Sequence, residues 1–262
     1  MRAATTAHPL VPPGRWKAWA GLAVFATAYV WAVQGVEVSV ARLVSGLPLL
    51  ARILGLMLAP DWSWLGRAVA GMAVSVQVAV LGTTLGMALA FPLAFVAARN
   101  IGRPATSVPG KQLLNLIRTF PEIILAVFFV AAYGPGPLAG MMAIGLHSSG
   151  SPGKLYAEVV ETIDPGPLEA LRAVGATRWR VFRFAVLPQV LPEFLALSLY
   201  RLEINARAAS VLGLVGAGGI GTLLVQALQF RRWEVVGTAL LVIVVAVTLI
   251  DTASAALRRR LV

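Results

Sequence analysis

Long apolar stretches alternate along this chain with short polar, charged or proline-containing segments. Most of the stretches are close to the ~20 residues that an α-helix needs to cross a bilayer. The pattern predicts an all-α integral membrane protein with about six transmembrane helices, because helices satisfy their own backbone hydrogen bonds in lipid. The expected spans are residues 16–33, 68–98, 113–133, 138–149 with an extension toward 156, 191–214 and 235–250.

Residues 35–61 follow a different pattern. Arg42 and Arg52 interrupt the stretch, and its leucines recur at steps of three and four residues. Such periodicity is typical of an amphipathic helix, so we expect an interfacial helix on the outer face, with a re-entrant segment as the alternative. The expected organisation is an N-terminal part at 1–61, holding a tail, a first membrane helix and the interfacial helix, and a core domain at 62–262.

Composition supports a membrane protein. Of the 262 residues, 58% are hydrophobic and only 13% are charged, whereas a soluble domain carries about 25% charged residues. A net charge of +11 would favour nucleic-acid binding in a soluble protein, but here the basic residues gather in segments expected inside the cell. We therefore expect a multi-pass plasma-membrane protein with both termini in the cytoplasm, the lipid bilayer around it and no nucleic-acid partner.

Enzymatic chemistry finds little support in the sequence. The chain has no cysteine and two histidines that are far apart, so no metal cluster can be drawn from them. The arrangement left for a membrane-embedded hydrolase or transferase is His147 with Ser148 or Ser149, and a polar helix end is the interpretation that we favour. We expect no catalytic residue and no metal site.

Residues 169–188 are both strongly charged and helix-patterned. Apolar residues recur at helical spacing on each side of Gly175, and arginines fill the second half. The pattern predicts a short helix, a glycine turn and a second short basic helix that Pro188 ends. On pattern alone, an ordinary loop between two membrane helices fits equally well.

This stretch resembles the EAA loop of binding-protein-dependent ABC importer permeases. Leu171 and Ala185 stand where that loop has an alanine and an isoleucine, and both stay apolar. In the family, the loop forms cytoplasmic coupling helices that dock into a groove on the ATPase subunit. The resemblance assigns ATPase coupling to Glu169, Ala170, Gly175, Leu187 and Pro188.

Ionisable groups inside a bilayer are costly and usually face the interior of the bundle. Arg118 and Glu122 are four residues apart, as are Glu203 and Arg207, so each pair is expected to meet on one helix face. Such pairs either fix helix packing or line a translocation pathway or gate, where arginine would bind anionic oxygens. The candidate pathway residues are Arg118, Glu122, Arg201, Glu203, Asn205 and Arg207.

A glycine-rich segment follows the fifth expected span. Gly216, Gly218 and Gly221 spell G-x-G-x-x-G, with Gly219 among them. No βαβ pattern surrounds this segment, so it is not a dinucleotide site. The chain also lacks G-x-x-x-x-G-K-[ST], so it is not its own ATPase by that mechanism. We expect an external turn in which the backbone bends sharply or packs closely.

A wider resemblance covers roughly residue 62 to the C-terminus. This pattern resembles the permease subunits of phosphonate ABC importers, which share the wider permease fold of the methionine importers. The segments that carry it are PE at 121–122, LYAE at 155–158, LPQVLP at 187–192, YRLEIN at 200–205, RA at 207–208 and VLGLVGAGGIG at 211–221.

The resemblance implies a type I ABC importer permease fold and the translocation of phosphonate or a related phosphorus oxyanion, phosphate or phosphite. It also implies three partners: ABC ATPase subunits, which bind the ATP and Mg²⁺, an extracytoplasmic substrate-binding protein, and a second permease copy, identical or related. This chain itself would hold no cofactor. The alternatives are another small solute such as methionine, a passive channel or scaffold, and a membrane-embedded enzyme.

Overall fold

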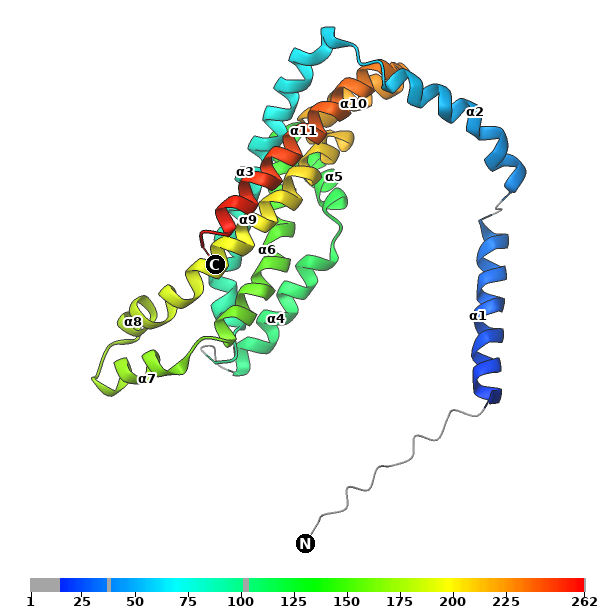
Figure 1. Cartoon of the computed structure of the whole chain (residues 1–262). Coiled ribbons are helices and arrows are strands. Elements are labelled where there is room, and N and C mark those ends of the chain that lie inside the picture. Colours follow the sequence, from blue (N-terminus) through cyan, green and yellow to red (C-terminus); the bar gives the residue numbers. More distant parts are fainter. Residues whose placement is uncertain (1–14, 37–38, 101–103, 262) are drawn as a thin grey trace. The chain divides into compact units, whose positions relative to one another are not determined.

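The computed structural model describes residues 15–36, 39–100 and 104–261. Most of the expected N-terminal tail therefore lies outside the described residues. The chain forms two compact units, Met1–Arg52 and Ile53–Val262. The first contains α1 (Arg15–Gly35), and α2 (Val40–Met57) begins in the first unit and ends in the second (Figure 1). The predicted division after residue 61 stays a prediction.

Helices long and apolar enough to cross a membrane recur through the described residues. One bent pair, Ala105–Thr119 with Glu122–Tyr133, meets the same criteria only when its two members are taken together. The single candidates are Trp16–Gly35, Val40–Met57, Trp62–Ala97, Arg178–Val215 and Trp233–Arg258. Because Val40–Met57 has the length and composition of a span, the interfacial position expected for this segment stays a prediction.

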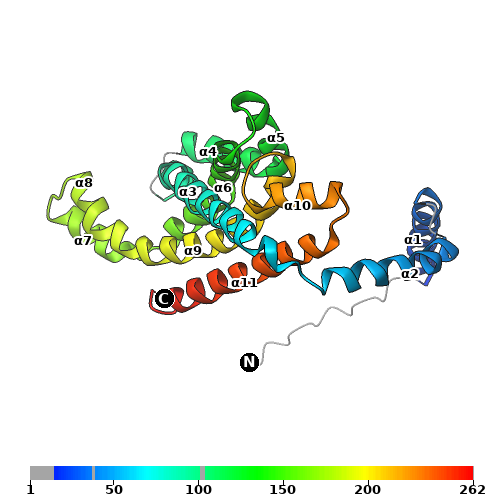
Figure 2. The same cartoon turned by 90° about the horizontal axis from the view of Figure 1, so that it is seen from above.

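The centre of the second unit is built by α3 (Leu65–Ala97) and α6 (Pro137–Glu161), which pack along each other, with α9 (Leu187–Leu212) beside them (Figure 2). Glycines permit this close approach. A Cβ on Gly82 would lie 2.7 Å from Cγ2 of Ile144, and a Cβ on Gly86 would lie 2.7 Å from Cβ of Ser148. The helix axes of α3 and α6 can therefore come together where these glycines stand.

α6 is the expected fourth span, yet it is not among the helices of the described residues that are long and apolar enough to cross a membrane. It continues through Pro152, and α3, α4 (Pro104–Thr119), α5 (Glu122–Tyr133) and α9 all pack against it. A helix surrounded by protein needs no lipid-compatible surface, so it can carry glycines and serines. This position explains why the span was the hardest to delimit from the sequence.

The expected third span is not one straight helix. α4 ends at Thr119, α5 begins at Glu122, and the two helices meet at 81°. Pro121 has no N–H to continue the helical ladder, and it disfavours the helical conformation of Phe120 before it. The span expected over 113–133 is therefore broken into two helices, which together have the length and composition of one span. Pro92, by contrast, lies inside α3 without ending it.

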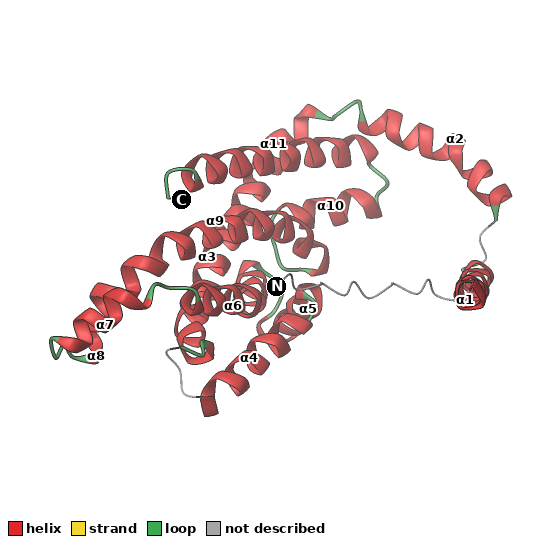
Figure 3. Ribbon diagram, turned by 60° about the horizontal axis from the view of Figure 1, so that its bottom comes forward, coloured by secondary structure: helices red, strands yellow, loops and turns green. Residues whose placement is uncertain are grey.

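The remaining helices are short or lie at the edge of the second unit. α7 (Pro165–Ala173) and α8 (Arg178–Val181) connect α6 to α9, while α10 (Ile220–Gln229) connects α9 to α11 (Trp233–Arg258). α7 and α8 lie at one end of this unit and α10 at the other (Figure 1). Every regular element of the described residues is helical, as Figure 3 shows.

Candidate functional site

The predicted helix–glycine–helix motif is present, and we call residues 165–181 the elbow. The Asp164 carboxylate caps the start of α7 by accepting a hydrogen bond from the Gly166 N–H at 2.9 Å. After α7, Gly175 adopts φ +75° and its N–H donates to the Arg172 carbonyl at 3.0 Å. A left-handed glycine just past a helix end is the usual way to stop a helix, so the predicted stop at Gly175 is confirmed.

The elbow exposes an apolar tip. Leu168 and Val181 anchor it by being buried, while Glu169, Ala170 and Gly175 are exposed. Val174 is 78% exposed and Trp179 is 66% exposed. Large apolar side chains gathered on a projecting turn mark a surface that a protein or a membrane covers. The structure thus brings three of the five predicted coupling residues to one exposed surface.

The other two coupling residues lie where the elbow becomes a span. A π-helical turn (Phe182–Val186) connects α8 directly to α9, and the Leu187 N–H donates to the Phe182 carbonyl, five residues back. Pro188 stands in the first turn of α9, where its missing N–H costs little. The prediction that Pro188 ends the second helix is therefore wrong. Helical backbone runs from the elbow into the span.

Gln189 is a functional candidate that the sequence-based analysis missed. Its Oε1 accepts a hydrogen bond from the Asp164 N–H at 2.9 Å, and its Nε2 donates to the Asp164 carbonyl at 3.3 Å and to the Ala185 carbonyl at 2.7 Å. One side chain of α9 thereby holds the residue that caps α7. Gln189 therefore ties the start of α7 to α9 by hydrogen bonds, in addition to the backbone connection through the π-helical turn.

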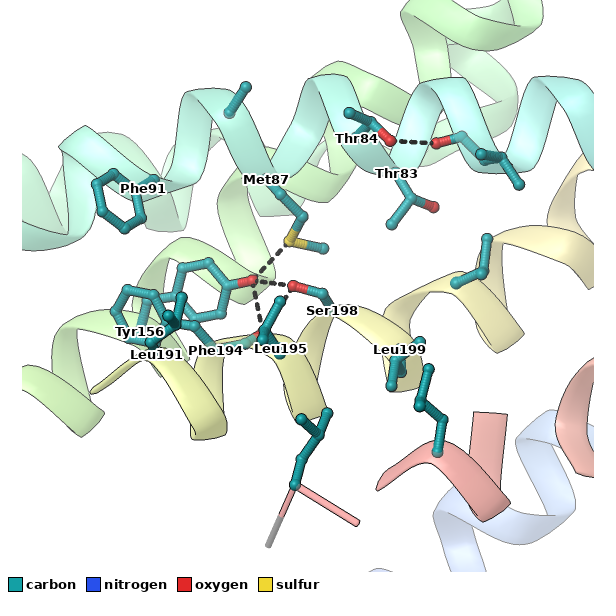
Figure 4. A pocket seen from close by; sticks show the side chains of 15 residues that line it. Thr83, Thr84, Met87, Phe91, Tyr156, Leu191, Phe194, Leu195, Ser198 and Leu199 are labelled. Atoms are coloured by element: carbon teal, nitrogen blue, oxygen red, sulfur yellow. Dashed lines mark hydrogen bonds between the residues drawn. The ribbon is translucent and has the colours of Figure 1, made fainter. Parts of the chain in front are cut away.

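Contacts between aromatic rings connect the π-helical turn after the elbow to α3, α6 and α9. The Phe182 ring lies 5.1 Å from Phe95, Phe95 lies 6.1 Å from Phe194, and Phe194 stacks on Tyr156 at 3.9 Å, all between ring centroids. The Tyr156 hydroxyl contacts Ser198 Oγ at 2.5 Å and the Phe194 carbonyl at 3.1 Å (Figure 4). Tyr156, Phe194 and Ser198 also line an apolar groove of about 600 Å³, to which α3, α6, α9 and α11 contribute.

Glu161 fixes the end of α6 just before the elbow, beyond the expected span. It accepts hydrogen bonds from Lys111 Nζ at 2.7 Å and from the Arg99 N–H at 2.9 Å. Burial alone would raise the pKa of this carboxyl, but the two hydrogen bonds and the positive charges outweigh burial and lower the pKa. The carboxylate form therefore holds α4 and α6 together at this end.

The first predicted intramembrane pair does not form. Arg118 is exposed in the last turn of α4, whereas Glu122 is the first residue of α5. The break at Pro121 places them on different helices, so they share no helix face. The expectation that Arg118 and Glu122 meet as an i, i+4 pair is wrong for this reason.

The second predicted pair is also wrong, because each member finds its partner on α11. Glu203 Oε1 lies 2.8 Å from Nη1 of Arg258, an ion pair without hydrogen-bond alignment. Arg207 donates to Asp251 Oδ2 at 2.5 Å. Both pairs join α9 to α11, so Glu203 and Arg207 contribute to helix packing. Spacing within α9 could not reveal partners from a helix later in the chain.

Arg201 and Asn205 belong to a polar cluster, which we define as Thr83, Ser148, Arg201 and Asn205. Arg201 Nε donates to Ser148 Oγ at 3.1 Å. Asn205 Nδ2 donates to Thr83 Oγ1 at 2.8 Å and to Ser148 Oγ at 2.9 Å. These residues come from the middle of α3, α6 and α9. Thr83 gave no signal in the sequence, and Ser148 was considered only as a possible nucleophile beside His147, not as a partner of Arg201.

The glycine-rich segment is a packed turn. Gly216, Gly218 and Gly219 have φ of +88°, +80° and +74°. A Cβ on Gly221 would lie 2.6 Å from the Gly213 Cα, so the start of α10 rests on the backbone at the end of α9. The predicted sharp turn with close packing is confirmed. Its external position stays a prediction.

The serine–histidine pair that a membrane-embedded enzyme would need is not formed by His147 with Ser148 or Ser149. His147 Nδ1 lies 3.1 Å from the Phe120 carbonyl, while Ser148 Oγ interacts with Arg201 and Asn205 and Ser149 Oγ donates to the Leu146 carbonyl. Neither serine contacts the imidazole among the described residues, so no nucleophile–base pair is formed.

Comparison with known proteins identifies the family. Residues 90–262 match the model of the binding-protein-dependent transport system inner membrane component. The chain belongs to this family. It is therefore a multi-pass membrane protein and a permease of the ABC importer class. This family membership agrees with the resemblance carried by the EAA loop.

The relatives of this permease are transport proteins. It is 42% identical over 218 residues to the phosphite transport system permease protein PtxC of Stutzerimonas stutzeri, covering 83% of this chain and 79% of that protein. It is 44% identical over 191 residues to the phosphate-import permease protein PhnE of Mycolicibacterium smegmatis, covering 72% of this chain and 36% of that protein.

Solved structures share the fold. An inward-facing structure of the MetNI methionine ABC transporter matches with a TM-score of 0.64 and 23% identity, covering 76% of this chain and 97% of that chain. An amino acid ABC transporter matches with a TM-score of 0.63 and 16% identity, covering 76% of this chain and 95% of that chain. At these identities the likeness shows the fold alone, which is that of type I ABC importer permeases.

Proposed function

We propose that this permease imports a phosphorus oxyanion, namely phosphonate, phosphite or phosphate, across the plasma membrane. The most direct support is the likeness to a phosphite permease over 79% of that relative's length. ATP and Mg²⁺ bind to partner ATPase subunits, an extracytoplasmic binding protein delivers the substrate, and a second permease copy, identical or related, completes the membrane part.

The elbow is the surface on which the ATPase acts. It projects from the second unit, it carries exposed Val174 and Trp179 at its tip, and a cavity of about 440 Å³ within it has Arg172 and Arg178 among its lining residues. Exposed arginines also favour a cytoplasmic position for the elbow under the positive-inside rule. With the interfacial position predicted for residues 35–61, both chain termini then lie on the cytoplasmic side.

Closure of the ATPase subunits on ATP moves the elbow, and the elbow moves α9 as one helical body. The continuous helix through Phe182–Val186, the Gln189 clamp and the aromatic contacts to Phe95 and Phe194 support a rigid connection. Such a lever alternates the spans between inward-open and outward-open arrangements by rigid-body motion.

Uptake into proteoliposomes tests this function. The permease is reconstituted with its ATPase and a binding protein loaded with phosphite, phosphate, methylphosphonate or methionine. We expect ATP-dependent uptake of at least one phosphorus oxyanion and no uptake of methionine. Liposomes without ATP, and liposomes without the binding protein, serve as controls. Uptake of methionine alone would contradict the substrate class, and uptake that continues without ATP would contradict the ATP-driven mechanism.

A further inference from the structure

Arg201 has hydrogen-bonding capacity that the chain leaves unused. A guanidinium carries five N–H donors. Among the described residues, Arg201 makes one hydrogen bond, from Nε to Ser148 Oγ at 3.1 Å. Its Nη2 is buried and has no hydrogen-bond partner. Buried polar groups in proteins nearly always find a partner, so a donor without one indicates a ligand.

The polar cluster holds this guanidinium from one side. Thr83 Oγ1 donates to the Ala79 carbonyl at 2.6 Å, so it accepts the hydrogen bond from Asn205 Nδ2. Ser148 Oγ donates to Asn205 Oδ1 at 3.2 Å and accepts from Arg201 Nε. Every hydroxyl of the cluster therefore has its donor and acceptor roles filled within the protein. Within the polar cluster, only the Arg201 guanidinium has N–H donors without an acceptor.

The charge of Arg201 also lacks a direct partner. Glu203 pairs with Arg258, and Asp251 pairs with Arg207. Within the described residues Arg201 itself forms no ion pair. An uncompensated charge among membrane helices costs several kcal/mol, and such charges usually mark a substrate or ion pathway. The arrangement holds a fixed, unpaired cation at the middle of α9.

We propose that Arg201 is the oxyanion contact of the translocation pathway, where its guanidinium binds oxygen atoms of the passing phosphorus oxyanion. This inference rests on the proposed function. The planar fork of a guanidinium matches two oxygens of a tetrahedral oxyanion, and Ser148 fixes the orientation of the fork by occupying Nε. The bound anion supplies the acceptor that Nη2 lacks and neutralises the charge during passage.

The test compares Arg201→Gln with Arg260→Gln, the same change at an exposed arginine beyond the end of α11, outside the polar cluster and the candidate pathway. The complete transporter is reconstituted in proteoliposomes and the import rate of phosphite is measured. We expect Arg201→Gln to lower import by about tenfold or more, because hydrogen bonds to a charged group are lost. Arg260→Gln is expected to import within about twofold of the unmodified protein.

Thermal melting of the purified permease–ATPase complex, without the binding protein, separates binding from folding. We expect phosphite to raise the melting temperature of the unmodified protein and of Arg260→Gln, and to leave that of Arg201→Gln unchanged. Arg201→Lys keeps the charge without the fork and should give an intermediate shift. If Arg201→Gln does not fold, Ser148→Ala replaces it, and its phosphite shift should be smaller than that of the unmodified protein.

The outcomes distinguish the inference from the proposed function. Phosphite import that is equal in Arg201→Gln and Arg260→Gln, or a phosphite shift that persists in Arg201→Gln, overturns the role of Arg201 and leaves the proposed function standing. An undiminished shift in Ser148→Ala overturns it where Arg201→Gln does not fold. If the unmodified transporter imports no phosphorus oxyanion, the proposed function fails, and the role of Arg201 fails with it.

Discussion

Replacing Gly175 with leucine is expected to abolish ATP-driven import while the permease stays folded. No atom lies within 4 Å of a Cβ built on Gly175, so the new side chain meets no part of this chain and projects outward. The backbone cost comes from φ +75° and is about 1–2 kcal/mol for a residue with a side chain. The larger effect is expected at the ATPase surface, because leucine would enter the contact that the exposed elbow tip makes.

Gly134→Leu is the control for this prediction. Gly134 has φ +85° and ψ 165°, a conformation nearly restricted to glycine, so leucine there also strains the backbone. It likewise has open space around its Cβ, but it lies in the turn between α5 and α6. The measurement is the ratio of substrate imported to ATP hydrolysed by the reconstituted transporter. We expect the ratio to fall to background for Gly175→Leu and to persist for Gly134→Leu. Equal, unimpaired ratios in both variants would remove the elbow from the coupling mechanism.

Replacing Gly213 with alanine is expected to cause a large loss of stability. A Cβ there would lie 2.4 Å from the carbonyl oxygen of Gly218 and 2.6 Å from the Cα of Gly221. Both contacts are with backbone, which cannot turn away as a side chain can. Separating α9 from α10 to admit the methyl group should cost about 3 kcal/mol or more, at the upper end of measured overpacking costs.

Gly66→Ala provides the comparison for Gly213→Ala. Gly66 lies in α3 with no atom within 4 Å of its Cβ, so alanine should be neutral or stabilise the helix by about 0.5–1 kcal/mol. Thermal melting of the detergent-purified permease measures both variants. We expect a clear drop in melting temperature for Gly213→Ala and none for Gly66→Ala. A stable Gly213→Ala protein would mean that the turn before α10 is not the close-packed contact described above.

The parts of the fold that local sequence determines were predicted well. The apolar runs, the stop at Gly175 and the sharp turn around Gly216 depend on residues within a few positions of one another, so periodicity and glycine chemistry suffice. α6 was harder because its surface faces other helices, and its glycines and serines reflect packing against α3 instead of contact with lipid.

The candidate site was predicted only in part, for a different physical reason. Glu203 and Arg207 were expected to pair along α9, but partners on α11 lie far away in sequence and no spacing rule points to Arg258 or Asp251. The role of Gln189 likewise depends on Asp164 at the start of α7. Side chains that act through long-range contacts leave no periodic signal.

The effect of each proline on its helix could not be predicted from the local sequence alone. Pro121 breaks its span, Pro188 opens one, and Pro92 and Pro152 lie within helices. The same residue type gives different outcomes because the neighbouring backbone decides whether the missing hydrogen bond can be tolerated. At Pro188 the preceding π-helical turn supplies that tolerance, which the sequence alone did not reveal.

The decisive measurement is the accessibility of a single cysteine at the elbow tip. The chain has no cysteine of its own, and Val174 is 78% exposed, so Val174→Cys gives one defined site for a membrane-impermeant maleimide. We predict labelling only from the cytoplasmic face of the membrane, and protection when the ATPase subunits are assembled. Labelling from the outer face, or labelling that the ATPase does not reduce, would contradict the role of the elbow in ATP-driven transport.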